Sequence, residues 1–323
     1  MRRRDFITLL GGAAAFAPLM ASAQEAGRTY RLAILTGSGR DTPQMLALFD
    51  ELRRFGFIEG QNLNVIPGGF NVRNEQLAER AAAMVKAAPD AIFAVGGLST
   101  RAAQEATRTV PIVGGADDMV EAGLVASLAR PGGNTTGVSM LSPELDGKRQ
   151  DILMEAVPGV RRMAALADSN IAPPRHLQAL QDAARARGVE LSVFSAGKPE
   201  EIVPGINNAK AWGAEALNVL ATPLFSSNRR IIFERVADVR LPAIYQWPEM
   251  AEEGGLAGYG PRLTETFRQR ARITVKVLRG TKPADLPVEQ PTRFELVINL
   301  RAAKAIGHEV PAGLVLRADK VIE

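Results

Sequence analysis

Short apolar runs alternate with amphipathic segments between residues 30 and 113. Runs such as YRLAIL (30–35) and AIFAV (91–95) are almost continuously apolar, which is typical of parallel strands covered on both faces. The pattern predicts strands over 30–35, 63–66, 91–95 and 112–113, and helices over 42–55, 75–86 and 99–107. This regular order implies a parallel sheet with right-handed crossovers.

The same alternation restarts at residue 145 and continues to about residue 257. It predicts helices over 145–156, 174–187, 199–211 and 228–239, and strands over 162–166, 190–194, 216–220, 243–244 and 256–257. The two halves share this rhythm but no obvious sequence identity. We therefore expect a second parallel sheet of similar size.

The stretch 122–148, AGLVASLARPGGNTTGVSMLSPELDGK, separates the two halves. It predicts a short apolar helix at its start, a break at RPGGN (130–134), an extended piece over 136–140 and a helix after residue 142. The break is sharp because proline lacks the N–H that a helix needs and the two glycines permit positive φ. We expect the chain to leave one compact unit and enter another here, with 136–140 as a hinge strand.

The C-terminal part predicts two further crossings between these units. A long amphipathic helix over 262–279 is followed by a proline-fixed link over 286–291, a strand over 294–299 and a helix over 301–306. This order suits a chain that returns to the first unit and leaves it again. The predicted division is a signal over 1–23, lobe 1 over 29–140 plus 261–288, and lobe 2 over 141–260 plus 289–323. Two domains are also expected because about 250–300 residues is the upper size of a single core.

The N-terminal residues predict export. RRRDFI (2–7) is basic, 9–20 is a short apolar run and Ala21-Ser22-Ala23 fits a cleavage site, which together describe a signal peptide. The paired arginines are similar to a twin-arginine export signal, and a Sec signal with extra arginines is the alternative. We therefore expect cleavage near Ala23 and a periplasmic protein.

Composition narrows the function classes. The chain has no cysteine, so it can form neither a disulfide nor a lipid-modified cysteine after the signal. Its net charge is +4, and the three arginines and one aspartate of the predicted signal account for half of it. The remaining charge is too small to indicate a nucleic-acid partner.

Motifs of catalysis and cofactor binding are missing. The sequence has no G-x-S-x-G elbow and no P-loop, and Thr42 stands where a dinucleotide fingerprint opening at Gly37 needs its third glycine. His176 and His308 have no partners at metal-ligand spacing and are expected to be plain surface residues. We predict no catalytic residue, no metal and no cofactor.

Loops that follow the predicted strands are the candidate ligand-binding elements. In open parallel sheets, ligands bind outside the carboxyl ends of the strands, where helix N-termini and backbone N–H groups converge. For each loop, an ordinary βα turn is the alternative. The candidate ligand-binding residues are Gly37, Ser38, Gly97, Leu98, Ser99, Asp117, Asp118, Asn170, Thr222, Tyr245 and Trp247.

Two pairs among these residues indicate ligand chemistry. Tyr245 and Trp247 directly follow a strand and could stack a flat or apolar ligand, or they could pack between the lobes. Asp117 and Asp118 could hold an ammonium group, or one of them could cap a helix. The sequence leaves open which of the two aspartates faces the cleft.

Long motifs along the chain resemble those of the ABC-transporter substrate-binding proteins that include tryptophan-binding members. They are FGFIEGQNLNV (55–65), GLVASLARPGGNTTGVSMLSPELDGKR (123–149), LPAIY (241–245), EEGGLAGYGP (252–261) and KPADLPVEQPTRFELVINLRAAKAIG (282–307). The resemblance implies an α/β fold of two Rossmann-like lobes with parallel sheets, joined by three crossover segments, as in type I periplasmic binding proteins. It also implies ligand capture and delivery to a membrane permease driven by an ATPase.

The expected function is therefore that of the periplasmic binding component of an ABC importer. The expected ligand is an amino acid or an aromatic carboxylate, and the protein is expected to act as a monomer with ABC permease and ATPase subunits. Two alternatives remain open at this point. One is a periplasmic sensor that presents the ligand to a receptor, and the other is an exported enzyme that uses the same cleft.

Overall fold

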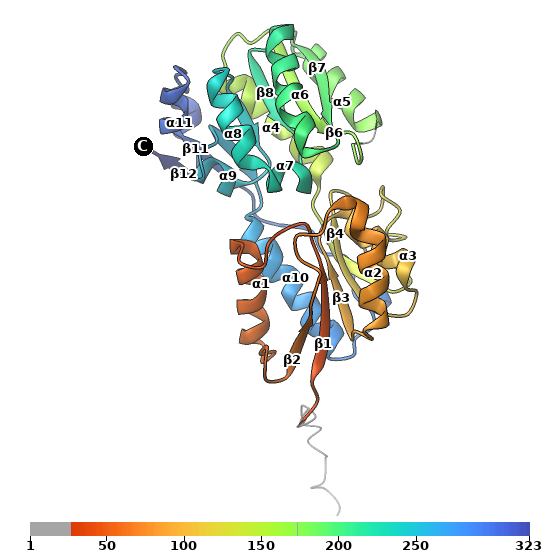
Figure 1. Ribbon diagram of the computed structural model, residues 1–323. Coiled ribbons are helices and arrows are strands. Elements are labelled where there is room, and N and C mark those ends of the chain that lie inside the picture. The colour runs from red at the N-terminus through yellow and green to blue at the C-terminus, as the bar shows by residue number, and fades with distance from the viewer. Residues whose placement is uncertain (1–26, 173) are drawn as a thin grey trace, which may run out of the picture.

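The computed structural model describes residues 27–172 and 174–323, so the predicted signal peptide lies outside the described residues. Two lobes lie end to end and are joined by a narrow waist (Figure 1). Each lobe is a twisted sheet with helices on both faces. Within the described residues, no helix combines the length and the apolar character that a membrane span requires.

Lobe 1 is built on a five-stranded sheet in which every pair is parallel, with the order β2-β1-β3-β4-β5. Helices α1 and α10 cover one face, and helices α2 and α3 cover the other. The strands are β1 (Tyr30–Leu35), β2 (Leu63–Ile66), β3 (Ala91–Ala94), β4 (Ile112–Ala116) and β5 (Thr135–Ser139). The helices are α1 (Pro43–Arg54), α2 (Leu77–Lys86), α3 (Gly97–Ala106) and α10 (Leu263–Leu278), with 3₁₀ turns at Asn74–Gln76 and Pro283–Asp285.

Lobe 2 is built on a seven-stranded sheet with the order β12-β11-β10-β9-β8-β6-β7. The strands are β6 (Arg162–Asp168), β7 (Glu190–Ala196), β8 (Ala216–Val219), β9 (Ala243–Tyr245), β10 (Ala257–Gly260), β11 (Glu295–Asn299) and β12 (Lys320–Ile322). The helices are α4 (Ser142–Ala156), α5 (Pro174–Ala186), α6 (Pro199–Trp212), α7 (Pro223–Ser227), α8 (Arg229–Asp238), α9 (Pro248–Glu252), α11 (Leu300–Ala305) and α12 (Ala312–Val315). Helices α4 and α5 pack on one face, and α6 and α8 pack on the other. This confirms the predicted two-lobed α/β fold.

One strand departs from the parallel arrangement expected for the second sheet. Strand β11 pairs with β10 in the antiparallel direction, with Ala257 opposite Ile298. The reason is the path of the chain. After β10 it enters lobe 1 as α10, which lies beside α1 (Figure 1), and it returns to lobe 2 at the end of the sheet where β10 stopped.

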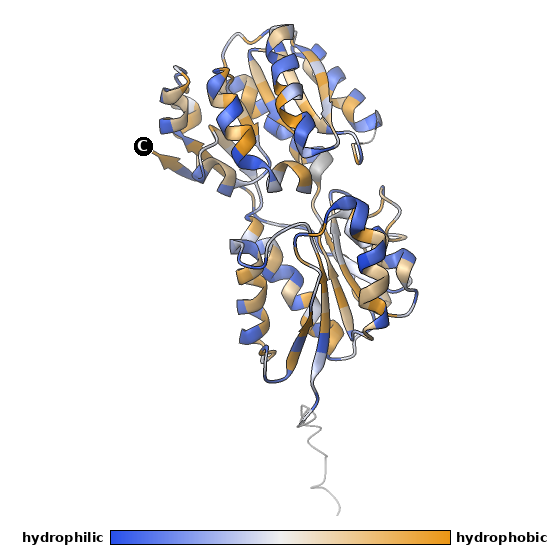
Figure 2. Ribbon diagram, in the orientation of Figure 1, coloured by the Kyte–Doolittle hydropathy of each residue, from blue (hydrophilic) through white to orange (hydrophobic). Residues whose placement is uncertain are grey.

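Apolar residues concentrate on the strands and on the inner faces of the helices (Figure 2). The helix-facing surfaces of both sheets are buried, and residues such as Leu32, Phe93 and Leu166 have no exposed surface. Burial on both sides explains why the strands are continuously apolar in the sequence. Each lobe therefore has its own core.

The predicted hinge strand is extended, and it pairs with the third crossing of the chain. The N–H of Glu289 donates to the carbonyl of Gly137 (2.9 Å), and the carbonyl of Glu289 accepts from the N–H of Ser139 (2.9 Å). A Cβ at Gly137 would lie 2.0 Å from the carbonyl oxygen of Gly114, so only glycine fits there. Two of the three crossings are thus hydrogen-bonded to each other at the waist.

Three local predictions were wrong or incomplete. The short apolar helix expected from residue 122 is a series of turns, in which Gly123 adopts a φ of 62° that a helix does not allow. Strand β4 continues through Gly114 and Gly115, which in the sequence resemble a turn. The C-terminal elements α12 and β12 were not predicted, because each has only three or four residues.

Candidate functional site

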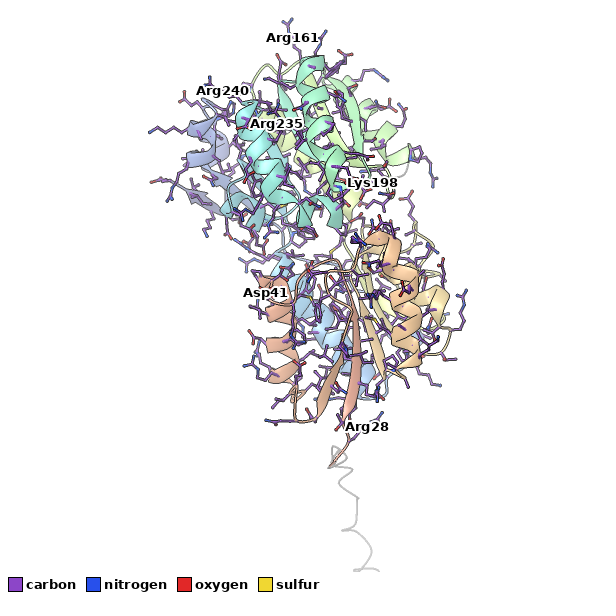
Figure 3. The ribbon with its side chains drawn as sticks, in the orientation of Figure 1. Arg28, Asp41, Arg161, Lys198, Arg235 and Arg240 are labelled. Carbon is purple, nitrogen blue, oxygen red and sulfur yellow. The ribbon has the colours of Figure 1, made fainter. Side chains whose placement is uncertain are left out.

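A cleft with a volume of about 900 Å³ lies between the lobes. Its walls are the loops at the carboxyl ends of both sheets, and α10 contributes Leu263, Phe267 and Arg270 to its lining. Lys198, a further lining residue, lies on the side of lobe 2 that faces lobe 1 (Figure 3). The crossover topology produces this arrangement, because both sheets present their carboxyl ends to the waist.

Ten of the eleven predicted ligand-binding residues line this cleft. They are Gly37, Ser38, Gly97, Leu98, Ser99, Asp117, Asp118, Asn170, Thr222 and Trp247. They come from six different βα loops that are far apart in the sequence. The rule that ligands lie at the carboxyl ends of parallel strands therefore placed these loops together.

Tyr245 is the exception, and its prediction as a cleft residue was wrong. Its side chain is 1% exposed and belongs to the core under α8. Its ring meets Phe233 edge-on, with centroids 5.1 Å apart and an interplanar angle of 89°, and burial raises its pKa. The physical reason is alternation: Tyr245 ends β9 on its helix-covered face, and the chain must continue beyond it to reach the cleft.

The residues after Tyr245 do reach the cleft. Gln246 is 1% exposed and donates from Nε2 to the carbonyl of Thr222 (3.0 Å). Trp247 is half-buried, and its indole Nε1 is buried without a hydrogen-bond partner in the described part of the chain. Such an orphan donor costs free energy when it is left unpaired. Trp247 thus lines the cleft and packs against the lobe 2 core, and its unpartnered N–H is buried.

The lobe 1 wall is the N-terminal end of α3. Gly96 caps this helix with a φ of 85°, and the first helical N–H groups have no intrahelical acceptor. The hydroxyl of the buried Ser99 forms no hydrogen bond with any residue in the described ranges. Free N–H groups and the helix dipole favour an anionic group at this point.

Of the two aspartates, Asp118 has a clear local role. Its Oδ1 accepts from the N–H groups of Val120 (2.8 Å) and Glu121 (2.9 Å), so it holds the turn that replaces the predicted helix. The charge of Asp117 raises the pKa of Arg149 and so opposes the larger lowering by burial. Both line the cleft, but the turn occupies one carboxylate oxygen of Asp118.

The lobe 2 wall contains a buried aspartate that is not among the predicted ligand-binding residues. Asp168 is 4% exposed and ends β6. Its Oδ1 accepts from the backbone and side-chain N–H groups of Asn170 (both 2.9 Å), and its Oδ2 accepts from the hydroxyl of Thr222 (2.7 Å). Asn170 and Thr222 therefore orient this carboxylate at the cleft surface.

A second missed group lies where α4 leaves the hinge. Arg149 is fully buried and donates to Asp146 (2.5 Å), to the carbonyl of Tyr259 (2.7 Å) and to the carbonyl of Gln246 (3.1 Å). Burial lowers the pKa of Arg149, and the charge of Asp146 opposes this effect. The other oxygen of Asp146 lies 3.0 Å from Nε2 of His176.

Neither histidine is a plain surface residue, contrary to the prediction. His176 lines the cleft beside Asp146, and Nε2 of His308 lies 2.9 Å from the carbonyl oxygen of Ala156. Their partners are 30 and 152 residues away, so no local spacing could reveal them. Across the described residues, no three His, Asp or Glu side chains gather in a way that would hold a metal ion.

Arg270 forms the floor of the cleft on the lobe 1 side. It is 1% exposed, and its Nη2 donates to the carbonyls of Ala94 and Val113 (3.2 Å for Val113) at the ends of β3 and β4. Its guanidinium carbon lies 4.0 Å from the ring centroid of Phe93. Burial lowers its pKa to about 9, so the group stays positively charged at neutral pH.

Parts of the two lobes approach each other beside the cleft. A Cβ on Gly96 would lie 2.9 Å from Cγ of Pro223, so the N-termini of α3 and α7 almost touch. Arg175 on α5 and Glu121 in lobe 1 form an exposed ion pair of 3.4 Å. The cleft is therefore already bounded by contacts between lobes.

Comparison with known proteins points to one family. The family model described as ABC transporter substrate binding protein matches residues 41–322. The tyrosine-binding protein of Clostridioides difficile is 26% identical over 256 residues, which cover 78% of this chain and 72% of that protein. Two solved structures cover 91% of this chain and all of their own: a conserved domain protein from Vibrio cholerae (TM-score 0.82, 24% identity) and an ABC domain from Streptococcus pneumonia in complex with L-Trp (0.79, 21%). At these identities, the solved structures show the shared fold.

Proposed function

The chain belongs to the family of ABC transporter substrate-binding proteins, and from this premise we propose that it is the periplasmic solute-binding component of an ABC importer. It captures a small organic ligand, an amino acid or an aromatic carboxylate, in the cleft between its lobes. It delivers this ligand to a membrane permease that an ATPase subunit drives. It acts as a monomer, and it releases the ligand chemically unchanged.

One observation carries this proposal. A cleft of about 900 Å³ is walled by the strand-end loops of two sheets, and the chain crosses between the two lobes at the waist. This volume lies in the range of small-molecule sites, roughly 300–1,000 Å³. Two rigid lobes around such a cleft can close on a ligand by bending the hinge, and closure changes the surface that a permease contacts.

The ligand class rests on the relatives and on the chemistry of the walls. One relative is named for tyrosine binding, and one structure of the same fold contains L-Trp. The free N–H groups at α3 suit a carboxylate, and the half-buried Trp247 suits an apolar or aromatic side chain. These features together favour an amino acid or an aromatic carboxylate.

Export to the periplasm is supported by the sequence alone. The basic RRRDFI start, the short apolar run and Ala21-Ser22-Ala23 describe a signal cleaved near Ala23. A binding protein that serves an importer must meet its ligand outside the inner membrane. Fractionation of cells that produce the full chain, followed by N-terminal sequencing of the periplasmic form, tests this part of the proposal.

A thermal-shift screen over amino acids, aromatic acids and purines tests the binding role. A ligand present at 100 times its Kd stabilises the folded protein by about 2.7 kcal/mol, which raises Tm by about 5 °C for a chain of this size. Calorimetric titration of each hit then measures Kd and reports any heat of turnover. The proposal fails if no compound shifts Tm, or if a hit is converted into product.

A further inference from the structure

A second cavity, with a volume of about 870 Å³, lies at the end of lobe 1 opposite the cleft. Its walls are the segments that lead into β1, β3, β4 and β5, together with the C-terminal end of α10 and the turn that follows it. Arg28, one of its lining residues, marks this end of the molecule in Figure 3. The second cavity shares no lining residue with the cleft, so it is a separate feature of the fold.

The charged residues that line the second cavity are mostly cationic. Four are basic and one is acidic: Arg28, Arg108, Arg279, Lys282 and Asp90. The basic side chains come from three segments, which lie before β1, after α3 and after α10. Like charges repel, so this excess of cations around one cavity requires a physical explanation.

Two of the arginines are held in place by their neighbours. Nη2 of Arg28 donates to Oδ1 of Asp90 (3.0 Å), and its guanidinium carbon lies 4.8 Å from the ring centroid of Tyr30. Nη2 of Arg279 donates to a backbone carbonyl at the end of α1 (3.0 Å). Oδ2 of Asp90 accepts from the N–H of Arg31 (2.7 Å). Each oxygen of the Asp90 carboxylate therefore already has a donor.

The other two cations have no counter-ion among the described residues. Arg108 and Lys282 are exposed, and neither forms an ion pair or a side-chain hydrogen bond with the part of the chain that the structure describes. Both side chains line the same cavity. Their charges are therefore available to a ligand.

Helix dipoles account for only part of the excess positive charge. Helix α10 ends at the second cavity, and α3 ends two residues before Arg108. Each helix C-terminus carries about half a negative charge, so the two helix ends together with Asp90 offset about two of the four cations. About two positive charges are left for a ligand to neutralise.

A glycine turn adds a neutral donor at the second cavity. Gly132 and Gly133 adopt φ values of 71° and 62°. The N–H of Gly133 has no acceptor within residues 27–172 and 174–323, and a Cβ at this position would meet nothing within 4 Å. Nδ2 of Asn134 donates to the carbonyls of Thr107 (3.2 Å) and Val110 (2.8 Å). These bonds fix the glycine turn to the loop that follows α3.

We infer that the second cavity binds a phosphate monoester, whose dianionic group pairs with Arg108 and Lys282 in the positive field of Arg28 and Arg279. A phosphate monoester carries nearly two negative charges at neutral pH, which matches the charge that is left, whereas a carboxylate would neutralise only half of it. Arginine and lysine are common phosphate ligands. The volume lies in the range of small-molecule sites, roughly 300–1,000 Å³, so the organic part of a small phosphorylated compound fits as well.

The test compares two phosphates that differ in charge. Methyl phosphate is a dianion at about pH 7.5, and dimethyl phosphate is a monoanion. The variant is the double substitution Arg108→Met and Lys282→Met. Its control is Lys210→Met and Lys304→Met, which changes the net charge equally at two exposed positions on α6 and α11 of lobe 2. Calorimetric titration of the full chain at low salt measures each Kd.

We expect the wild type to bind methyl phosphate about tenfold more tightly than dimethyl phosphate, because the second negative charge reaches a second cation. The double variant should bind methyl phosphate about tenfold more weakly than the wild type, and the control should bind like the wild type. Added salt should weaken binding, since the cations are exposed. Absence of binding, equal Kd values for the two phosphates, or an unchanged Kd in the double variant would overturn the inference.

The empty double variant gives a readout that needs no ligand. Arg108 and Lys282 have no partner to lose in the described structure, so its Tm should equal that of the wild type. A fall of about 5 °C or more would show that the two cations serve the fold and would overturn the inference.

Amide NMR signals show where the phosphate binds. Methyl phosphate should shift the signals of Gly133 and Gly280, which line the second cavity, and leave that of Gly97 in the cleft unchanged. A shift of Gly97 alone would place the phosphate in the cleft and overturn the inference.

Vesicles separate a soluble phosphate from a lipid headgroup. Vesicles of phosphatidylcholine and phosphatidic acid in equal amounts present phosphate monoesters on a surface. Retention of the protein on these vesicles without any binding of methyl phosphate would overturn the inference in favour of a membrane surface. None of these measurements involves a cleft ligand, so the proposed function is tested separately.

Discussion

Replacing Arg149 should be one of the most damaging single changes in lobe 2. Its guanidinium connects α4 to the ends of β9 and β10 and is paired with Asp146, and both side chains are at most 4% exposed. Arg149→Met leaves the carboxylate of Asp146 buried with only His176 beside it. Breaking a buried pair in this way costs about 3–5 kcal/mol, a large part of the stability of a typical domain.

The chain offers a matched control on the neighbouring helix. Asp182 and Arg185 form a pair with the same i,i+3 spacing on α5, but their side chains are 57% and 75% exposed. Arg185→Met should therefore change the free energy of unfolding by less than about 0.5 kcal/mol.

Urea unfolding followed by tryptophan fluorescence measures both variants. Trp212 and Trp247 are the two tryptophans of the chain, and both lie in lobe 2. The midpoint should fall by about 1–2 M for Arg149→Met and stay in place for Arg185→Met. Asp146→Asn added to Arg149→Met should recover at least about 2 kcal/mol, because the uncompensated charge is gone. A loss below about 1 kcal/mol, or a double variant as unstable as the sum of the singles, would refute this reasoning.

Three further predictions concern the cleft, the hinge and acid stability. Trp247→Phe removes the unpartnered indole N–H, so it should raise the calorimetric Kd of the tightest-binding ligand of the screen. It should change Tm of the empty protein by under about 3 °C, and a larger fall in Tm would place Trp247 in the core. Gly137→Ala should lower the free energy of unfolding in urea by about 3 kcal/mol or more, because its Cβ would overlap the carbonyl of Gly114. On α4, a Cβ at Gly147 would meet nothing within 4 Å, so Gly147→Ala should raise the free energy of unfolding by about 0.5–1 kcal/mol. Equal effects of the two substitutions would contradict the hinge geometry. Two backbone N–H groups lower the pKa of Glu215. Its contribution to stability is therefore present above its unfolded pKa and is lost as pH falls through its folded pKa. Glu215→Gln should flatten the loss of stability between about pH 5 and pH 3, and an unchanged pH profile would contradict this role of Glu215.

Repetition of the strand-helix pattern was enough to predict the two sheets. Strands buried on both faces need continuous apolar runs, and this requirement is visible in the chain without any tertiary information. The pattern failed where glycine replaced apolar residues. Strand β4 continues through Gly114 and Gly115. These strand positions are glycine because Thr100 and Arg270 occupy the space that side chains would need, and the sequence does not show what lies opposite a glycine.

The sequence predicted which loops surround the candidate site, but it did not predict two of the buried charged residues there. Strand-end loops supplied ten of the residues around the cleft, because the carboxyl ends of parallel strands must share one edge. Asp168 was missed because its partner Thr222 is 54 residues away, and Asp146 was missed because the burial of its pair with Arg149 is not encoded locally. Tyr245 was selected by type, although alternation along β9 turns it into the core.

Helix α10 shows most clearly what each level determined. The sequence by itself determined an amphipathic helix with several arginines, because helical spacing and polar residues suffice for that. Only the tertiary structure decided that Arg268 pairs at the surface while Arg270, two positions later, lies under the cleft with no ion pair to any residue that the structure describes. The difference is physical: the energy of a charge depends on its solvent and its partners, and both are set by segments that folding brings together.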